Sequence, residues 1–252
     1  MKTFYVSTVV AALMTAAAAQ EAVNPVMEKF ADHISLYVNF DDETVNPALA
    51  GGEKTLKAPP RNPGFAPGLF GKALRLGSAS YHCPGNIDFS KPGTLIYWMA
   101  PAGEWPVEGK YPYLFPFVAF PGDSKIVMGR QAGDYGKTRI YLNVETPERK
   151  DWVGNGIAGG SGRDWAKDSW HMIVFSWTPE STGISVDGKP VNEVALKRPL
   201  AKGEGEWFAF TTQLKDDSVH QVMIDEITVL NRKLSDEEVK SLYDETLKRV
   251  KK

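Results

Sequence analysis

The sequence predicts an all-β domain of antiparallel strands that ends in a short helix. Short segments rich in β-branched and aromatic residues alternate with Gly- and Pro-rich turns along most of the chain. The pair Asp187-Gly188 lies between two such segments, and both residues tolerate the positive φ of a tight hairpin turn. Ser235 followed three residues later by Glu238 is a capping box, which predicts the first turn of the C-terminal helix.

The first residues have the pattern of an export signal. Lys2 provides the positive start, residues 4–16 form a short apolar stretch, and three alanines at 17–19 form a small-residue cleavage site. No second long apolar run follows, and no Cys follows the small residues as in a lipoprotein. We therefore predict a signal peptide over residues 1–19, a single domain over residues 20–252, a secreted or periplasmic location and no membrane insertion.

Composition and charge exclude some classes of partner. The 252 residues carry 29 Lys and Arg against 31 Asp and Glu, a formal net charge of −2. This balance gives no electrostatic basis for binding nucleic acid or an anionic membrane. Cys83 is the one cysteine, so no internal disulfide forms, and an exported chain of this kind must derive its stability from a large core. We interpret Cys83 as a buried apolar residue.

The first half of the chain supplies three predicted elements. A short helix is expected within residues 25–30, followed by a core strand at 34–40 in which every second residue is large and apolar. An acidic loop comes next, and a short strand follows near residues 74–76. Residues 95–99 are apolar on both faces, which is typical of a central strand covered on both sides.

The second half is richer in strands. The strongest strand signal is at residues 170–177, and a hairpin over Asp187-Gly188 follows it. A glycine-rich loop is expected at 154–162. Further strands are predicted at residues 114–120, 126–130, 138–144, 206–211 and 223–230.

Four segments, in the same order, resemble the laminin-G-type domains of the concanavalin A-like lectin/glucanase superfamily. They are the Gly-Leu-Phe-Gly-Lys-Ala-Leu run at 68–74, the Trp-Met-Ala-Pro run at 98–101, Trp-His-Met-Ile-Val at 170–174 with Ile-Ser-Val-Asp-Gly-Lys-Pro-Val at 184–191, and the closing segment 223–238. The resemblance spans about residues 34–244. It implies an antiparallel two-sheet jelly-roll sandwich, with five to seven strands in each sheet and the last strand beside the first.

The resemblance also implies a calcium site. Many members hold a structural cation between the loop after the first strand and an acidic residue of the last strand, and the matching residues here are Asp41 and Asp225. Carboxylate and carbonyl oxygens suit Ca²⁺, which would stabilise the fold by joining the terminal strands. The alternative is that Asp225 accepts hydrogen bonds from backbone amides or pairs with a lysine.

Aromatic residues in predicted loops are the candidates for ligand binding. Sugar rings stack on exposed aromatic faces, and loops rich in Gly and Pro make exposure plausible. The alternative is that these side chains close the ends of the sandwich. The five candidates are Trp105, Tyr111, Tyr113, Trp152 and Trp165. Trp98, Trp170 and Trp177 belong to predicted strands and are assigned to the core.

No catalytic constellation is evident. The glucanases of the superfamily carry Glu-x-Asp-x-x-Glu on one strand, and this sequence contains no such run. The four histidines lie far apart without a His-Glu-x-x-His motif, and we interpret His171 as a hydrogen-bonded structural residue. His82 next to Tyr81 leaves a lyase-type base open as an alternative.

These observations favour an exported, non-catalytic carbohydrate-binding or surface-recognition module. Its expected partner is a glycan or a cell-surface polysaccharide. Two other functions remain open at this point: a polysaccharide hydrolase or lyase with an atypical site, and a structural subunit that binds other proteins.

Overall fold

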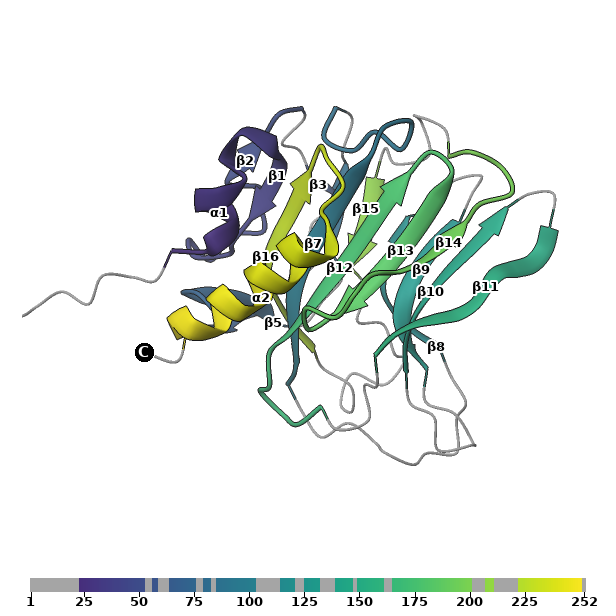
Figure 1. The fold of residues 1–252 in the computed structure, drawn as a ribbon. Helices are drawn as coiled ribbons and strands as arrows, with labels where there is room; N and C mark the ends of the chain where they lie inside the picture. Colours follow the sequence, from purple (N-terminus) through teal and green to yellow (C-terminus); the bar gives the residue numbers. More distant parts are fainter. Residues whose placement is uncertain are drawn as a thin grey trace, which may run out of the picture.

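The computed structural model shows two antiparallel β-sheets packed face to face, with two helices on one outer side (Figure 1). The residues that the structure describes are 23–52, 56–58, 64–75, 79–82, 85–102, 114–120, 125–131, 139–146, 149–160, 165–200, 207–210 and 222–250. The predicted signal peptide lies outside them. None of the helices in these residues is long and apolar enough to cross a membrane.

The larger sheet, sheet A, has nine strands in the described residues. Along it lie β14 (Asn192–Ala195), β13 (Ser181–Val186), β12 (His171–Thr178), β7 (Gly93–Pro101), β16 (Val222–Leu230), β1 (Ile34–Val38) and β2 (Leu49–Ala50), and a hairpin of β4 (Gly64–Pro67) and β5 (Lys72–Arg75) joins it through β16. All these pairings are antiparallel.

The second sheet, sheet B, has seven strands, also antiparallel. In order across the sheet they are β11 (Arg149–Gly160), β10 (Arg139–Thr146), β9 (Lys125–Gln131), β8 (Leu114–Phe120), β15 (Trp207–Phe210), β6 (Ala79–His82) and β3 (Leu56–Ala58). The predicted two-sheet sandwich is therefore confirmed. Sheet A exceeds the expected five to seven strands because short strands such as β2 and β4 carry no strong sequence pattern.

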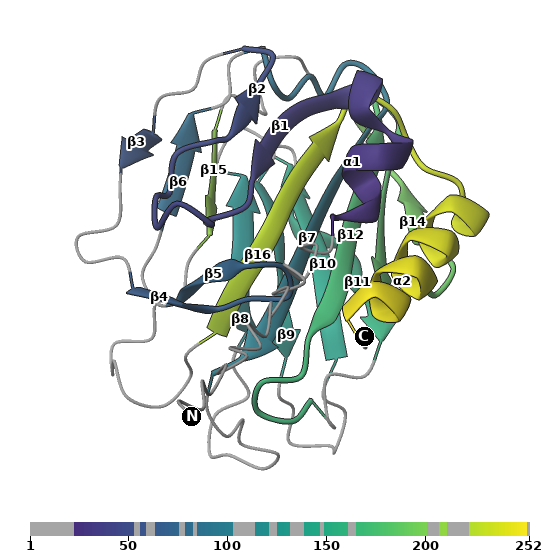
Figure 2. The ribbon, with the colours of Figure 1, turned by 90° about the vertical axis from the view of Figure 1, so that its left-hand side faces the viewer.

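The central position of β7 and the pairing of the last strand with the first were both predicted correctly. β7 lies between β12 and β16, and every one of its nine residues is buried. β16 lies between β7 and β1, with Leu230 opposite Ile34 and Ile227 opposite Val38. The two ends of the folded domain are thus joined within one sheet (Figure 2).

The main core fills the space between the sheets. Alternate residues of β7, such as Leu95, Tyr97 and Met99, point into it and are fully buried. Aromatic rings from both sheets meet there, Phe120 of β8 and Phe175 of β12 with 5.6 Å between the ring centroids. The Phe89 ring, from the turn before β7, lies edge-on to Trp177, with 5.0 Å between the ring centroids. A Cβ at position 93 would lie 2.1 Å from the Trp177 ring, so close packing of this indole requires glycine.

The outer face of sheet A is covered by the helices. The other face of β7 presents Ile96 and Trp98 to α2 (Asp236–Val250), where Trp98 stacks on Tyr243 with 5.9 Å between the ring centroids. The short helix α1 (Pro25–Lys29), followed by the 3-10 turn η1 (Ala31–His33), lies beside it. Figure 2 shows both helices on this face of the sheet. The predicted N-terminal helix is therefore confirmed.

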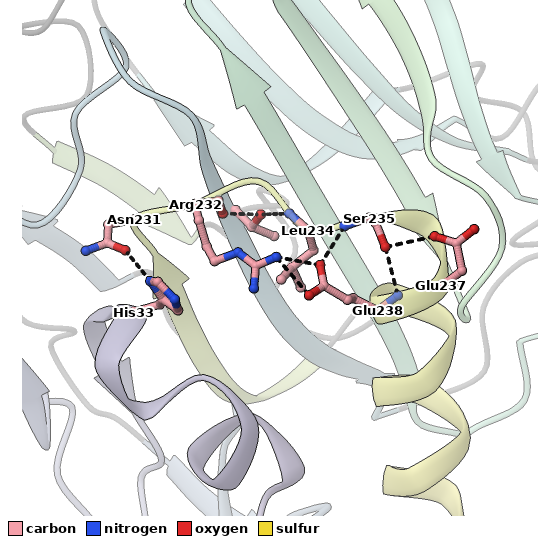
Figure 3. A network of polar contacts seen from close by, with 8 residues as sticks. His33, Asn231, Arg232, Leu234, Ser235, Glu237 and Glu238 are labelled. Carbon is pink, nitrogen blue, oxygen red and sulfur yellow. Dashed lines mark hydrogen bonds and ion pairs between the residues drawn. The ribbon is translucent and has the colours of Figure 1, made fainter.

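The start of α2 is fixed by the predicted capping box. The Ser235 hydroxyl accepts a hydrogen bond from the Glu238 amide at 3.3 Å, and the Glu238 carboxylate accepts one from the Ser235 amide at 2.9 Å. The Thr94 hydroxyl donates to the Arg232 carbonyl and accepts from the Leu234 amide. Figure 3 shows Arg232 and Ser235 both directed at Glu238. The connection between β16 and α2 is therefore anchored to β7.

One predicted element is wrong. The glycine-rich segment expected as a loop at 154–162 belongs, up to Gly160, to the edge strand β11. Its register with β10 shifts at several points, and glycine is tolerated at such irregularities because it lacks a side chain. The predicted turn over Asp187 and Gly188 is confirmed, since both have positive φ, 55° and 69°.

Candidate functional site

An irregularity in β16 buries two neighbouring carboxylates. Asp225 pairs with Trp98 of β7, but the next paired residue is Thr228, so the strand bulges between them. Glu226 in the bulge has a φ of 55°, unusual for a residue with a side chain. In a regular strand these adjacent side chains would point to opposite faces. Here Asp225 is 0% exposed and Glu226 1% exposed.

Asp225 holds the turn between β4 and β5. Its Oδ2 accepts hydrogen bonds from the amides of Leu69, at 2.8 Å, and Phe70, at 3.3 Å, while its Oδ1 accepts from the Glu226 amide at 2.9 Å. A Cβ at Gly68 would lie 2.5 Å from Asp225 Oδ2, so the turn approaches the carboxylate as closely as glycine allows. Backbone amides are therefore the direct partners of this predicted calcium ligand.

Asp41 holds the other side of the same turn. Its Oδ1 accepts a hydrogen bond from the Lys72 amide at 3.0 Å, and its Oδ2 accepts from the Asn39 side chain at 2.6 Å. Gly71 has a φ of +60°, and a Cβ there would lie 2.0 Å from Asp41 Oδ1. The two residues predicted to share a calcium ion thus both accept hydrogen bonds from backbone amides at the same turn, between β4 and β5.

Glu226 links the sheet to the N-terminal helix. Its Oε2 accepts hydrogen bonds from the Tyr37 hydroxyl, at 2.7 Å, and from the Asn24 side-chain amide. Asn24 is in turn the N-cap of α1, because its Oδ1 accepts from the Val26 amide at 3.0 Å. Burial raises the pKa of Glu226 to about 7 despite these two donors. Burial, followed by repulsion from Glu226, raises the pKa of Asp225 well above its usual range.

The cluster fits a hard cation in donor type. Two buried carboxyl groups, whose raised pKa values show that their charged forms are disfavoured, lie near a third at Asp41, and a divalent cation would favour the ionised forms. Within the described ranges, however, no three or more acidic, His or Cys side chains surround a common point. Backbone carbonyls and water would have to complete the oxygen shell that Ca²⁺ requires. Asp41 and Asp225 as calcium ligands therefore stay a prediction.

A pocket opens at one end of the outer face of sheet A. Its volume is about 460 Å³, within the range of small-molecule sites. It lies between the β4–β5 hairpin and the segment that precedes β12. It is lined by Ala66, Pro67, Gly68, Arg75, Ala102, Lys167, Asp168, Trp170 and Met223.

The apolar side of the pocket follows from strand register. Met223 of β16 pairs with Arg75 of β5 on one side and with Ala100 of β7 on the other. Met223 and Ala100 are buried in a small cluster against which Trp170 packs. Paired residues of neighbouring strands face the same side of a sheet, so alanines at these positions leave room above them. The half-buried Trp170 indole bounds that space.

The segment that carries Lys167, Asp168 and Trp170 is held in place from several directions. The Asp168 amide donates to the Pro101 carbonyl at 2.8 Å, at the end of β7, and Asp168 has a φ of 60°. The Trp165 ring stacks on His171 with 3.9 Å between the centroids. These contacts preform the pocket wall, which lowers the entropic cost of binding a ligand.

His171 lies at the centre of a Ser-His-Asp chain. Its Nδ1 is 2.9 Å from Asp187 Oδ2 and its Nε2 is 2.9 Å from Ser169 Oγ. The Ser169 hydroxyl also donates its proton to the Ala166 carbonyl at 2.6 Å, so His171 is not placed to accept that proton as a general base. Neither Ser169 nor His171 lines the pocket. The chain confirms the predicted hydrogen-bonded structural role of His171 and fixes the segment before β12.

The aromatic residues predicted to bind ligand are placed only in part. Trp105, Tyr111 and Tyr113 lie outside the described residues, and for Trp152 the structure describes the strand β11 but not the side chain. Trp165 is 6% exposed and packs in the main core, as an aromatic that closes one end of the sandwich would. Ligand binding by these five residues stays a prediction.

Sequence reasoning missed the pocket residues. Trp170 was assigned to the core because it belongs to the strand predicted at 170–177, yet β12 begins at His171 and Trp170 lines the pocket. Arg75 does show a signal, since it alternates with the buried Leu74 and so faces outward. The sequence around Lys167 and Asp168 gives no such signal. These residues precede β12, and it is the pairing of β12 with β7 that brings them to the pocket.

The fold is shared with several binding domains of known structure. The binding domain of botulinum neurotoxin serotype D matches with a TM-score of 0.65 and 9% identity over 86% of this chain and 52% of its own. The binding domain of Paraclostridial Mosquitocidal Protein 1 matches with a TM-score of 0.60 and 14% identity over 85% of this chain and 52% of its own. The chain thus spans about half the length of these toxin domains.

A third structure is matched over nearly its full length. Domain 4 of AbnA, a GH43 extracellular arabinanase from Geobacillus stearothermophilus, solved in complex with arabinotriose, has a TM-score of 0.60 and 16% identity over 84% of this chain and 98% of its own. No curated protein sequence matches the chain. The model of the concanavalin A-like lectin/glucanases superfamily matches residues 76–240, well over half of the sequence. Together with the two-sheet sandwich, this match shows that the chain belongs to the concanavalin A-like lectin/glucanase superfamily.

Proposed function

We propose that the protein is an exported, non-catalytic module that binds a carbohydrate, and that the pocket beside Trp170 is its binding site. The observation that carries the proposal is a preformed pocket in which an indole lies beside charged side chains. Sugars are bound by this combination, because the apolar face of the ring stacks on the aromatic and the hydroxyls bond to polar groups. The arabinotriose complex of AbnA domain 4 supports a glycan as the kind of ligand.

Binding without catalysis agrees with the chemistry of the pocket. Glycoside hydrolysis needs two carboxyl groups on either side of the scissile bond. Of the described residues that line the pocket, only Asp168 carries a carboxyl group. The buried acids Asp225 and Glu226 are engaged by amide and hydroxyl donors and are closed off from solvent. A bound glycan would therefore be held and released unchanged.

The calcium ion belongs to the proposal as a structural element. Held by Asp41 and Asp225, it would offset the repulsion within the acidic cluster and stabilise the β4–β5 turn. That turn includes Gly68, which lines the pocket. Calcium would then affect binding indirectly, through the stability of one wall.

The test is a glycan-array screen of the purified protein, followed by titration calorimetry on any hit. Trp170→Ala should abolish binding, whereas Tyr243→Ala, which removes another half-buried aromatic from the same face of sheet A, should leave it intact. A parallel assay for new reducing ends or unsaturated products should stay at background. Absence of binding to every glycan would refute the proposal, and product release would establish the hydrolase or lyase alternative.

Export is tested separately by the N-terminus of the protein recovered outside the cytoplasm. Cleavage after Ala19 should leave Gln20 as the first residue, read by mass spectrometry. A mature protein that retains Met1 would contradict export through this signal.

A further inference from the structure

The hydrogen-bonding groups around the pocket are dominated by cationic donors. Arg75 presents a guanidinium and Lys167 an ammonium group, and neither side chain can accept a hydrogen bond. Asp168 is the one acidic side chain in the described lining. Among the described lining residues, two side chains are cationic and one is anionic, although the formal net charge of the protein is −2. A neutral sugar, whose hydroxyls both donate and accept hydrogen bonds, does not require more cationic donors than anionic acceptors.

The two cations lie on opposite sides of the pocket's apolar base. Strand register places Arg75 of β5 beside Met223 of β16, and Met223 beside Ala100 of β7. The segment that leads into β12 lies on the other side of Ala100, because β12 pairs with β7. Arg75 thus approaches from the β4–β5 hairpin, and Lys167 from the segment that also carries Trp170. A ring lying on the indole would meet a cation at either edge.

Lys167 is available to a ligand. It is exposed, and no acidic side chain in the described parts of the chain pairs with it. The backbone around it is fixed, because the Asp168 amide bonds to the Pro101 carbonyl and the Ser169 amide bonds to the Ala166 carbonyl at 3.1 Å. A cation on a fixed backbone at the edge of a pocket can bind an anionic group with a smaller loss of conformational entropy than a lysine on a mobile loop.

We propose that this pocket binds an anionic sugar residue, a hexuronate or a sulfated hexose, within a longer glycan. The ring lies against Trp170, the acidic group is bound by Lys167 or Arg75, and the Asp168 carboxylate accepts a hydroxyl donor from the same ring. This inference rests on the proposed function, since it names the class of carbohydrate that the same pocket recognises.

The experiment compares ligands that differ only in charge. Titration calorimetry is run with an oligogalacturonate and its fully methyl-esterified form, and with a sulfated galactan oligosaccharide and its desulfated form. One charged ligand should bind at least tenfold more tightly than its neutral counterpart, because a hydrogen bond between charged partners is stronger than one between neutral groups. Its affinity should fall as sodium chloride is raised. The pair that shows the difference identifies carboxylate or sulfate as the recognised group.

Variants then assign the effect to the pocket. At least one of Lys167→Gln and Arg75→Gln should weaken binding of the charged ligand about tenfold and leave the neutral form unaffected. Lys189→Gln removes an exposed lysine outside the pocket and should change nothing. Thermal melts of each variant separate lost binding from lost folding.

The outcomes are distinct. Equal affinity for the charged and neutral members of both pairs would overturn the anionic-sugar inference while leaving glycan binding intact. A charge preference that survives both pocket substitutions would also overturn it. Failure of every glycan, neutral or charged, to bind would refute the proposed function itself.

Discussion

The guanidinium of Arg232 donates two hydrogen bonds to the Glu238 carboxylate, at 2.8 Å to Oε1 and 2.7 Å to Oε2. This pair joins the end of β16 to the first turn of α2 and reinforces the capping box (Figure 3). The same guanidinium lies over the Phe30 ring, 5.3 Å from its centroid, just after α1. One side chain therefore contacts both helices that cover sheet A.

Glu238→Gln should destabilise the protein by about 1 kcal/mol at pH 7, since the lost ion pair is partly buried and includes two hydrogen bonds from Arg232 Nη2. Burial alone would raise the pKa of Glu238, but the Ser235 amide and the Arg232 guanidinium hold it below its ordinary value of 4.5. A lowered pKa stabilises the fold above pH 4.5, and that contribution is lost as the pH falls through the lowered value.

Urea unfolding of the wild type and Glu238→Gln from pH 7 down to pH 3 measures this. The difference in unfolding free energy should be largest at pH 7 and shrink toward pH 3. Asp244→Asn is the control, because it removes an exposed pair with Lys240 that contributes only about 0.3–0.5 kcal/mol. A difference that does not vary with pH would mean that charge is not the source of the effect.

Tyr37→Phe should destabilise the protein by about 1–3 kcal/mol, because it leaves the buried Glu226 carboxylate with one donor fewer. Tyr141→Phe is the matched control, since Tyr141 is also buried but its hydroxyl bonds to none of the residues that the structure describes. Chemical denaturation of both variants gives the comparison. Equal losses would show that the Tyr37 hydroxyl contributes nothing through Glu226.

If calcium binds at Asp41 and Asp225, calcium should raise the melting temperature of the wild type and chelator should reverse the rise. Asp41→Asn should remove most of this response, while Asp244→Asn, at a distant surface carboxylate, should retain it. Differential scanning fluorimetry at several calcium concentrations is sufficient. If calcium does not change the melting temperature of the wild type, the calcium prediction is wrong, and both aspartates only accept hydrogen bonds from the turn.

Gly71→Ala should cost more stability than Gly85→Ala. Both glycines have positive φ, +60° and +79°, so each alanine incurs a conformational cost of about 1–2 kcal/mol. At Gly71 the new Cβ would also lie 2.0 Å from Asp41 Oδ1, whereas at Gly85 the nearest atom is 3.3 Å away. Thermal unfolding of the two variants separates steric conflict with Asp41 from backbone strain. Equal losses would show that Asp41 is free to move aside.

Local sequence patterns were sufficient for much of the fold. Alternating apolar residues located β7 and β12, Ser235 and Glu238 located the start of α2, and Asp187-Gly188 located a hairpin turn. Each of these features depends on residues close together in the chain. The pairing of β16 with β1 is non-local, and only the resemblance to the superfamily supplied it.

The bulge in β16 and the pocket could not be predicted locally. Glu226 has positive φ without any glycine or turn motif nearby, so a regular strand was the reasonable expectation, and the burial of both acids went unrecognised. The pocket depends on two strand pairings, of β16 with β5 and of β16 with β7, which bring Arg75, Met223 and Ala100 into one row. This row of residues can be recognised only when the order of the strands in the sheet and their register are known.

The position of β16 has a consequence for how the molecule acquires its structure. Two of its neighbours, β1 and β7, come from the first half of the chain, and β16 lies between them in sheet A, so they do not pair with each other. During synthesis from the N-terminus, the edges of β1 and β7 that pair with β16 therefore stay unpaired until β16 has been made. Such non-local pairing makes folding slow, and the open edges favour aggregation meanwhile. Truncation before residue 222 should leave a chain that associates instead of a smaller folded domain.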